Sequence, residues 1–95
     1  MTTSSSLVKT ATPTRLITRL CRHWGHKFPV SFDNQRGEIT LGIGRCLMAA
    51  DGVGLHVDLE AESLENLSRL EGVVAAHLQR MAGSEELCFN WERQA

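Results

Sequence analysis

The chain has 95 residues, of which 42% are hydrophobic and 22% are charged. This length suits one small domain, and the near-average composition argues against a disordered chain or a membrane protein. Ten lysines and arginines against eleven aspartates and glutamates leave a formal charge of -1. The overall charge therefore gives no reason to expect nucleic acid or an anionic membrane as a partner.

The charges are nevertheless distributed unevenly along the chain. Every formally charged residue from Lys9 to Lys27 is basic, whereas the segment from Asp51 to Glu71 holds six acidic residues and one arginine. We expect an electrically polar molecule whose first helix is basic.

The first six residues, MTTSSS, are small and polar, and no apolar targeting segment follows Met1. We expect residues 1–6 to form a disordered tail and residues 7–95 to form a single domain. The cysteines are odd in number and far apart, which favours a reducing, cytoplasmic location. No apolar run approaches the ~20 residues that a membrane-spanning helix requires.

The first half of the domain reads as strand, helix, strand. Residues 7–11 alternate apolar and polar and predict a short edge strand. Thr12 and Pro13 are typical of a helix start, with the threonine oxygen as a cap, and Gly25 suits a left-handed helix end. One face of this helix is apolar, and residues 28–32 then alternate as a strand.

The second half reads as a meander followed by a helix and a strand. Turn residues separate three predicted strands at 38–41, 45–50 and 55–60, and the last alternates like a sheet with one wet face. Ser63 caps a helix with apolar residues at helical spacing as far as Gly83. Residues 87–91 alternate and predict a C-terminal strand.

The resulting order, β-α-β-β-β-β-α-β, predicts an α+β fold. We expect an antiparallel sheet of about five to six strands with both helices packed on one face. The other face would meet water or a partner.

The segment after the first helix concentrates residues that could bind a ligand. Cys21, His23 and His26 are typical metal ligands, but their helical spacing places Cys21 and His23 about 200° apart. A metal site would require the helix to unwind, so we treat these three residues as weak candidates. The sequence indicates no particular cofactor.

His77 lies near the centre of the apolar arc of the second helix, so we expect it to be buried. It is either a core histidine with one hydrogen-bond partner or part of a cluster with His23 or His26. Glu85 or Glu86 could add a carboxylate, which is the usual way to build a general base. No nucleophile elbow or phosphate-binding loop accompanies these residues.

A basic stripe on the first helix could bind phosphates or another anion, or could simply be solvated. Trp24 could line a pocket beside the histidines. The stripe consists of Arg15, Arg19, Arg22 and Lys27.

Three strings, TRLCRHWGHKFPVSFD, LMAADGVGLHVDLEAES and LEGVVAAHLQRMAGSEELCFNW, resemble a bacterial family of small proteins, domain of unknown function 2218. The resemblance covers nearly everything after residue 6. Phenylalanine is frequent in the family where this chain has Met81. Family members look to occur beside iron and siderophore uptake functions, so the resemblance implies a role near iron acquisition. The matching positions are His23, His26, Lys27, Val73, Val74, His77, Leu78, Met81, Glu86 and Leu87.

We therefore favour a non-catalytic, cytoplasmic domain that binds a small anionic or iron-related ligand. Two alternatives stay open: a small enzyme in which His77 or His26 acts as a base oriented by Glu86, and a protein-interaction module that forms a homodimer through its sheet. The ligand-binding candidates are His23, Trp24, His26, Lys27, His77 and Glu86.

Overall fold

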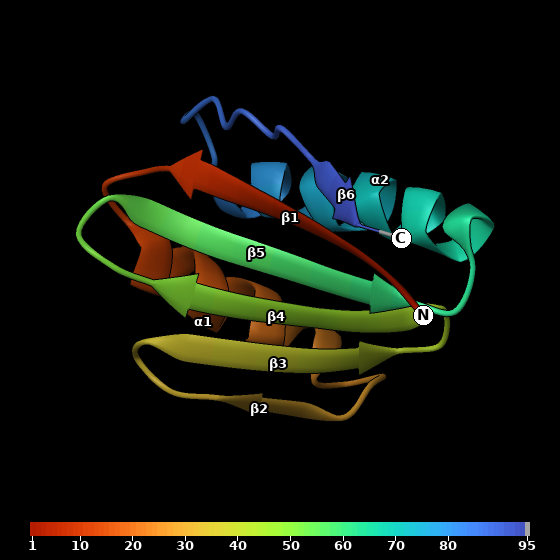
Figure 1. The fold of residues 1–95 in the computed structure, drawn as a ribbon. Helices are drawn as coiled ribbons and strands as arrows, with labels where there is room; N and C mark the ends of the chain where they lie inside the picture. The colour runs from red at the N-terminus through yellow and green to blue at the C-terminus, as the bar shows by residue number, and fades with distance from the viewer. Residues whose placement is uncertain (95) are drawn as a thin grey trace.

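Six antiparallel strands form one sheet, in the order β2-β3-β4-β5-β1-β6, in the computed structural model, which describes residues 1–94. Both helices lie on the same face of this sheet (Figure 1). The predicted α+β fold and its element order are confirmed. The elements are β1 (Thr2–Lys9), α1 (Pro13–Trp24), β2 (Val30–Phe32), β3 (Arg36–Leu41), β4 (Gly44–Ala50), β5 (Gly54–Ala61), α2 (Leu64–Met81) and β6 (Glu92–Gln94).

Strand alternation separates a buried face from an open face. In β5 the apolar side chains Leu55, Val57 and Leu59 are fully buried beneath the helices, and the intervening side chains point away from them. Strand pairing aligns the outward residues in transverse rows, one of which runs Glu38, Leu47, Asp58, Ser5 and Glu92. The open face is therefore polar, with a few apolar side chains.

Helix α1 begins at Pro13, as expected, and buries one face against β3 and β4. The Thr12 side chain caps no amide, although its carbonyl accepts a hydrogen bond from the Leu16 amide. The expected left-handed conformation of Gly25 is wrong: its φ of -61° continues the right-handed turn, and its amide bonds to the Cys21 carbonyl. The chain leaves the helix through a further turn. The buried residues of α1 are Leu16, Ile17, Leu20, Cys21 and Trp24.

Helix α1 packs directly on β3 because Gly37 has no side chain. A Cβ atom at Gly37 would lie 2.9 Å from the Ile17 Cγ2 atom and 3.0 Å from the Cys21 sulfur. These distances are shorter than an ordinary van der Waals contact. Gly37 therefore sets how closely the helix approaches the sheet.

Helix α2 has the predicted start and length. The Ser63 hydroxyl accepts a hydrogen bond from the Asn66 amide at 3.1 Å, which caps the first turn. The helix ends at Met81, and Gly83 then takes a positive φ of 64°, a conformation that suits glycine after a helix end. Within residues 1–94, neither helix has the length and apolar character needed to cross a membrane.

The expected disordered tail at residues 1–6 is wrong, because five of these residues belong to β1. Ser4 and Ser6 point beneath α2 and the C-terminal segment and are 2% and 5% exposed. The Ser4 hydroxyl donates to a Glu71 carboxylate oxygen at 2.7 Å. Because Glu71 satisfies the buried Ser4 hydroxyl, the burial of this polar side chain costs little free energy.

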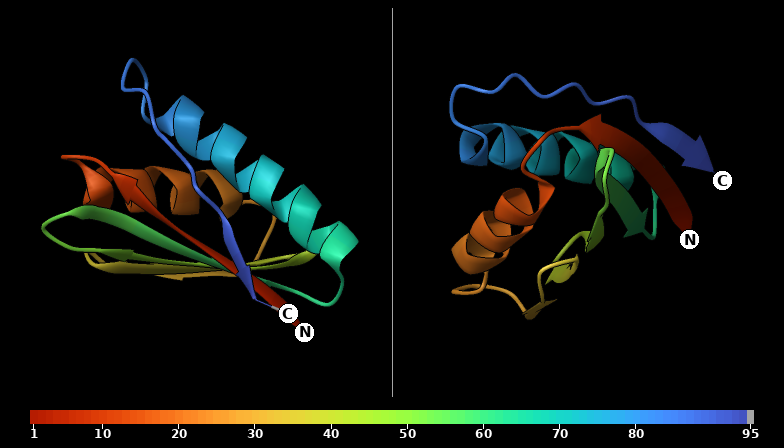
Figure 2. Two further views of the ribbon diagram at one scale, coloured as in Figure 1. Left: turned by 45° about the horizontal axis from the view of Figure 1, so that its top comes forward. Right: turned by 90° about the vertical axis from the view of Figure 1, so that its left-hand side faces the viewer.

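The expected C-terminal strand at residues 87–91 is also wrong. This segment runs as an irregular strap beside β1 and α2, and the last strand begins only at Glu92 (Figure 2). The Gln79 side chain holds the strap by accepting from the Leu87 amide and donating to the Glu85 carbonyl. The alternation instead reflects packing of Leu87, Phe89 and Trp91 against the core.

Candidate functional site

The turn that follows α1 brings several candidate residues together. The Trp24 carbonyl accepts hydrogen bonds from the Lys27 amide at 3.0 Å and the Phe28 amide at 2.9 Å. These bonds curl the chain so that the end of the helix and the start of the next segment lie side by side. The indole of Trp24 is buried and meets the Phe28 ring edge-on, with ring centroids 6.4 Å apart.

Helix α2 adds His77 to this cluster. Its imidazole centroid lies 4.8 Å from the Trp24 ring and 5.5 Å from the His23 ring. The predicted proximity of His77 and His23 is therefore present. His77 is half-buried at the surface, however, and its expected position in the core is wrong. The buried face of α2 is centred on a different side of the helix from His77. It consists of Leu67, Leu70, Glu71, Val74 and Leu78.

The hydrogen bond of His77 fixes its tautomer when the ring is neutral. Its Nδ1 lies 2.8 Å from the Val73 carbonyl oxygen. A carbonyl oxygen can only accept, so Nδ1 carries the proton and Nε2 carries the lone pair. Nε2 has no hydrogen-bond partner in residues 1–94.

These side chains line a surface hollow of about 510 Å³, which we call the histidine pocket. One part of the lining is apolar or aromatic, and another part consists of three histidines and one lysine. Among residues 1–94 no carboxylate lines this pocket, so its electrostatics suit a neutral or anionic ligand. The lining residues are His23, Trp24, His26, Lys27, Phe28, Leu41, Gly42, Ile43, Val73 and His77.

The β3–β4 turn supplies the part of this lining that no sequence motif indicates. Leu41, Gly42 and Ile43 come from a turn between two strands of the meander, where no polar residue marks a site. The pairing of Leu41 with Gly44 closes this turn, which lines the pocket together with the end of α1 and with Val73 and His77 of α2. Knowledge of the strand order would have been needed to find it.

Cys21 does not join the histidines. Its side chain is 1% exposed and lies beneath α1 against Gly37, on the face that packs on the sheet. Burial raises the pKa of the Cys21 thiol to about 11, which disfavours the thiolate that a metal would need. Within residues 1–94 no group of three or more His, Cys, Asp or Glu side chains is placed to hold a metal ion.

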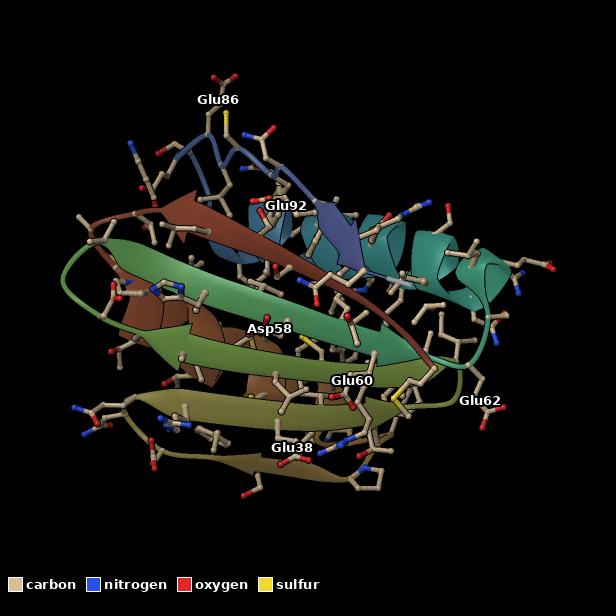
Figure 3. The ribbon with its side chains drawn as sticks, in the orientation of Figure 1. Glu38, Asp58, Glu60, Glu62, Glu86 and Glu92 are labelled. Atoms are coloured by element: carbon tan, nitrogen blue, oxygen red, sulfur yellow. The ribbon has the colours of Figure 1, made fainter. Side chains whose placement is uncertain are left out.

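Glu86 does not approach the histidine pocket either. It follows α2, is exposed, and points outward from the strap (Figure 3). Its neighbour Glu85 accepts a hydrogen bond from the Thr10 hydroxyl at 2.9 Å. The structure therefore does not assemble the expected pair of a histidine and Glu86. A histidine–carboxylate contact occurs elsewhere, between His56 and Asp51 at 2.6 Å, beside the β4–β5 turn.

The predicted basic stripe is divided between different roles. Arg15 and Arg22 are exposed, whereas the Arg19 guanidinium donates to the Met81 carbonyl at 2.9 Å and links α1 to the end of α2. Met81 contributes to the packing around the core. Lys27 is the member of the stripe that reaches the histidine pocket.

The open face of the sheet carries a second hollow, of about 580 Å³. Arg45 forms ion pairs with Glu38 and Glu60 there, whereas Asp58 has no ion pair within residues 1–94. Figure 3 shows Glu38 on β3 and both Asp58 and Glu60 on β5, with β4 between these two strands. The alternative function, a protein-interaction module, would use this open face of the sheet.

Together, the fold and the two hollows define a small α+β domain with one open sheet face and a helix-side histidine pocket. A family model described as an uncharacterized protein conserved in bacteria matches residues 5–92. The chain therefore belongs to this family, DUF2218, and the resemblance noted in the sequence is confirmed.

One solved structure is similar over nearly the whole chain. It is the NMR structure of PA4090 from Pseudomonas aeruginosa, which is 40% identical. The match covers 97% of this chain and 96% of that chain, with a TM-score of 0.81. No curated protein sequence matches this chain significantly.

Proposed function

We propose that this bacterial domain is a non-catalytic, cytoplasmic binding protein whose histidine pocket takes a small anionic ligand with an apolar body. One observation carries the proposal: an aromatic-lined hollow, without a lining carboxylate from the described residues 1–94, brings together His23, His26, Lys27 and His77. Cationic or neutral polar groups beside apolar walls are the usual composition of a small-molecule site.

The two parts of the lining would bind different parts of such a ligand. Lys27 supplies a point charge for a carboxylate or a similar anion. Trp24, Phe28 and Ile43 supply apolar surface for the body of the ligand. An iron-related ligand falls within this class, because organic iron chelators frequently combine carboxylate or phenolate oxygens with an aromatic ring.

Binding is favoured over catalysis because Glu86, the expected orienting carboxylate, lies outside the pocket. A histidine without such a partner can still accept or donate a hydrogen bond to a ligand. The same residues therefore suit recognition better than proton abstraction.

Ligand titration followed by NMR would test the proposal. Benzoate represents a simple anion with an apolar body, and 2,3-dihydroxybenzoate with and without ferric iron represents the iron-related class. The Trp24 indole signal should shift, whereas Trp91, which stacks on Phe89 outside the pocket, serves as an internal control.

Two variants would sharpen this test. Lys27→Met should weaken binding of either anion several-fold, and Lys9→Met, at an exposed site on β1, should leave it unchanged. If neither ligand shifts the Trp24 signal, or if both variants bind equally, the proposed function is wrong. Binding of the iron complex alone would restrict the ligand to the iron-related class.

The second candidate function is docking of a protein partner, including a second copy of the chain, on the open sheet face. The hollow on this face favours this alternative, and so does its lining residue Asp58, which has no ion pair among residues 1–94. Sedimentation of the wild type and of an Asp58→Arg variant would test self-association, which the substitution should alter if two copies meet through this face.

A further inference from the structure

The state of His77 adds a requirement to the ligand. The Nδ1–H group is committed to the Val73 carbonyl, 2.8 Å away, within the same helix. The neutral ring can therefore offer the pocket a lone pair at Nε2 and cannot offer an N–H group there without changing tautomer and losing this bond.

The other polar groups of the pocket differ in what they offer. The Lys27 ammonium group can only donate hydrogen bonds, whereas neutral His23 and His26 can each donate and accept, and among residues 1–94 no carboxylate lines the pocket. A ligand that presents an anion alone would satisfy Lys27 and leave the Nε2 lone pair of His77 without a donor. The ring also lies close to Trp24 and His23, so any ligand group at Nε2 would be partly shielded from water.

We infer that the histidine pocket selects a hydroxylated carboxylate, whose carboxylate binds near Lys27 and whose hydroxyl group donates to Nε2 of His77. This inference rests on the proposed function and specifies the chemical class of its ligand. It predicts discrimination between a hydroxyl group and an ether of similar shape, because an ether oxygen has no hydrogen to donate.

A matched ligand series tests this requirement. The probes are benzoate, the three monohydroxybenzoates and the corresponding methoxybenzoates, all titrated at pH 8. At least one hydroxybenzoate should bind about threefold to tenfold more tightly than its methoxy counterpart, the factor expected for one partly exposed hydrogen bond.

Two variants assign the preference to an atom. His77→Leu removes the Nε2 acceptor and should abolish the hydroxyl preference while benzoate still binds. His56→Leu, at a histidine on β5 that does not line the pocket, should keep the preference. A dispersed amide NMR spectrum shows that each variant still folds.

The outcomes separate this inference from the proposed function. If benzoates bind but hydroxyl and methoxy compounds bind equally, the hydroxyl requirement is wrong and the anion site stands. Retention of the preference in His77→Leu, or its loss in His56→Leu, would also overturn the assignment. If no benzoate of the series binds, the proposed function fails together with the inference.

Discussion

Glu71 on α2 and Arg93 on β6 form a two-point ion pair, in which the Arg93 Nη2 and Nε atoms lie 2.7 and 3.1 Å from the two Glu71 carboxylate oxygens. The Ser4 hydroxyl donates to the same carboxylate. The Glu71 side chain therefore joins helix α2 to Ser4 of β1 and to the last strand.

Glu71→Ala should destabilise the fold by about 1–3 kcal/mol, because it leaves the Ser4 hydroxyl and the Arg93 guanidinium without their acceptor. Urea denaturation measures this loss as a lower midpoint. Glu92→Gln is the matched control, because Glu92 is exposed and precedes Arg93 on β6. It should change the midpoint little. Equal midpoints for the wild type and Glu71→Ala would contradict the role assigned to this pair.

The stabilisation from Glu71 should disappear in acid. The bond from Arg93, and that from Ser4, lower the pKa of Glu71 despite the opposing effect of burial. A carboxyl group whose folded-state pKa is lowered stabilises the protein above its unfolded pKa, about 4.3, and this stabilisation is lost as the pH falls through the folded-state value.

The difference in unfolding free energy between the wild type and Glu71→Gln checks this dependence. It should be constant from pH 7 to about pH 5 and should shrink progressively below about pH 4.3. A difference that grew towards low pH would have the wrong sign and would reject the assignment.

Two glycine substitutions should change stability in opposite directions. Gly44→Ala would place a Cβ atom 2.2 Å from the Glu60 carbonyl oxygen, which is backbone and cannot move aside cheaply, so the loss should exceed about 2 kcal/mol. Gly72→Ala, within α2, meets nothing within 4 Å and should add about 0.5–1 kcal/mol through helix propensity. Thermal unfolding of both variants provides the comparison, and a stable Gly44→Ala protein would refute this account of the β4–β5 approach.

The three thiols should differ in reactivity. Cys21 and Cys46 are buried, which raises the pKa of each, whereas Cys88 is exposed. Iodoacetamide at pH 8 should therefore add one group rapidly to the native protein, at Cys88, and three groups in urea. Mass spectrometry with peptide mapping checks the sites, and rapid native modification of Cys21 would show that α1 separates readily from the sheet.

The two helices could be predicted because their signals are local. Pro13 and the apolar spacing mark α1, and Ser63 with a long 3.6-residue period marks α2. The serines of β1 carry no such signal, because their hydrogen-bond partners are distant in sequence: Glu71 is 67 positions beyond Ser4, and Asn90 is 84 positions beyond Ser6. The strap at 87–91 has the alternation of a strand but no strand partner.

The histidine pocket was partly predictable for the same reason. His23, Trp24, His26 and Lys27 lie close together in sequence, and His77 could be assigned by its helical position. The depth of His77 was misjudged because Glu71 reads as a solvent-facing residue, although it is 7% exposed and belongs to the buried face of α2. Glu86 was misassigned because its direction depends on the irregular strap.

The missing side chain at Gly37 also has a consequence for how the sheet assembles. A slip of β3 by one residue would bring Arg36 or Glu38 beneath Ile17 and Cys21 and would bury an unpaired charge under α1. Helix α1 can therefore pack closely only on a sheet in which β3 has the correct register. The positions of Trp24 and His23 depend on where α1 packs. A misaligned sheet would therefore lack the pocket as well as the core.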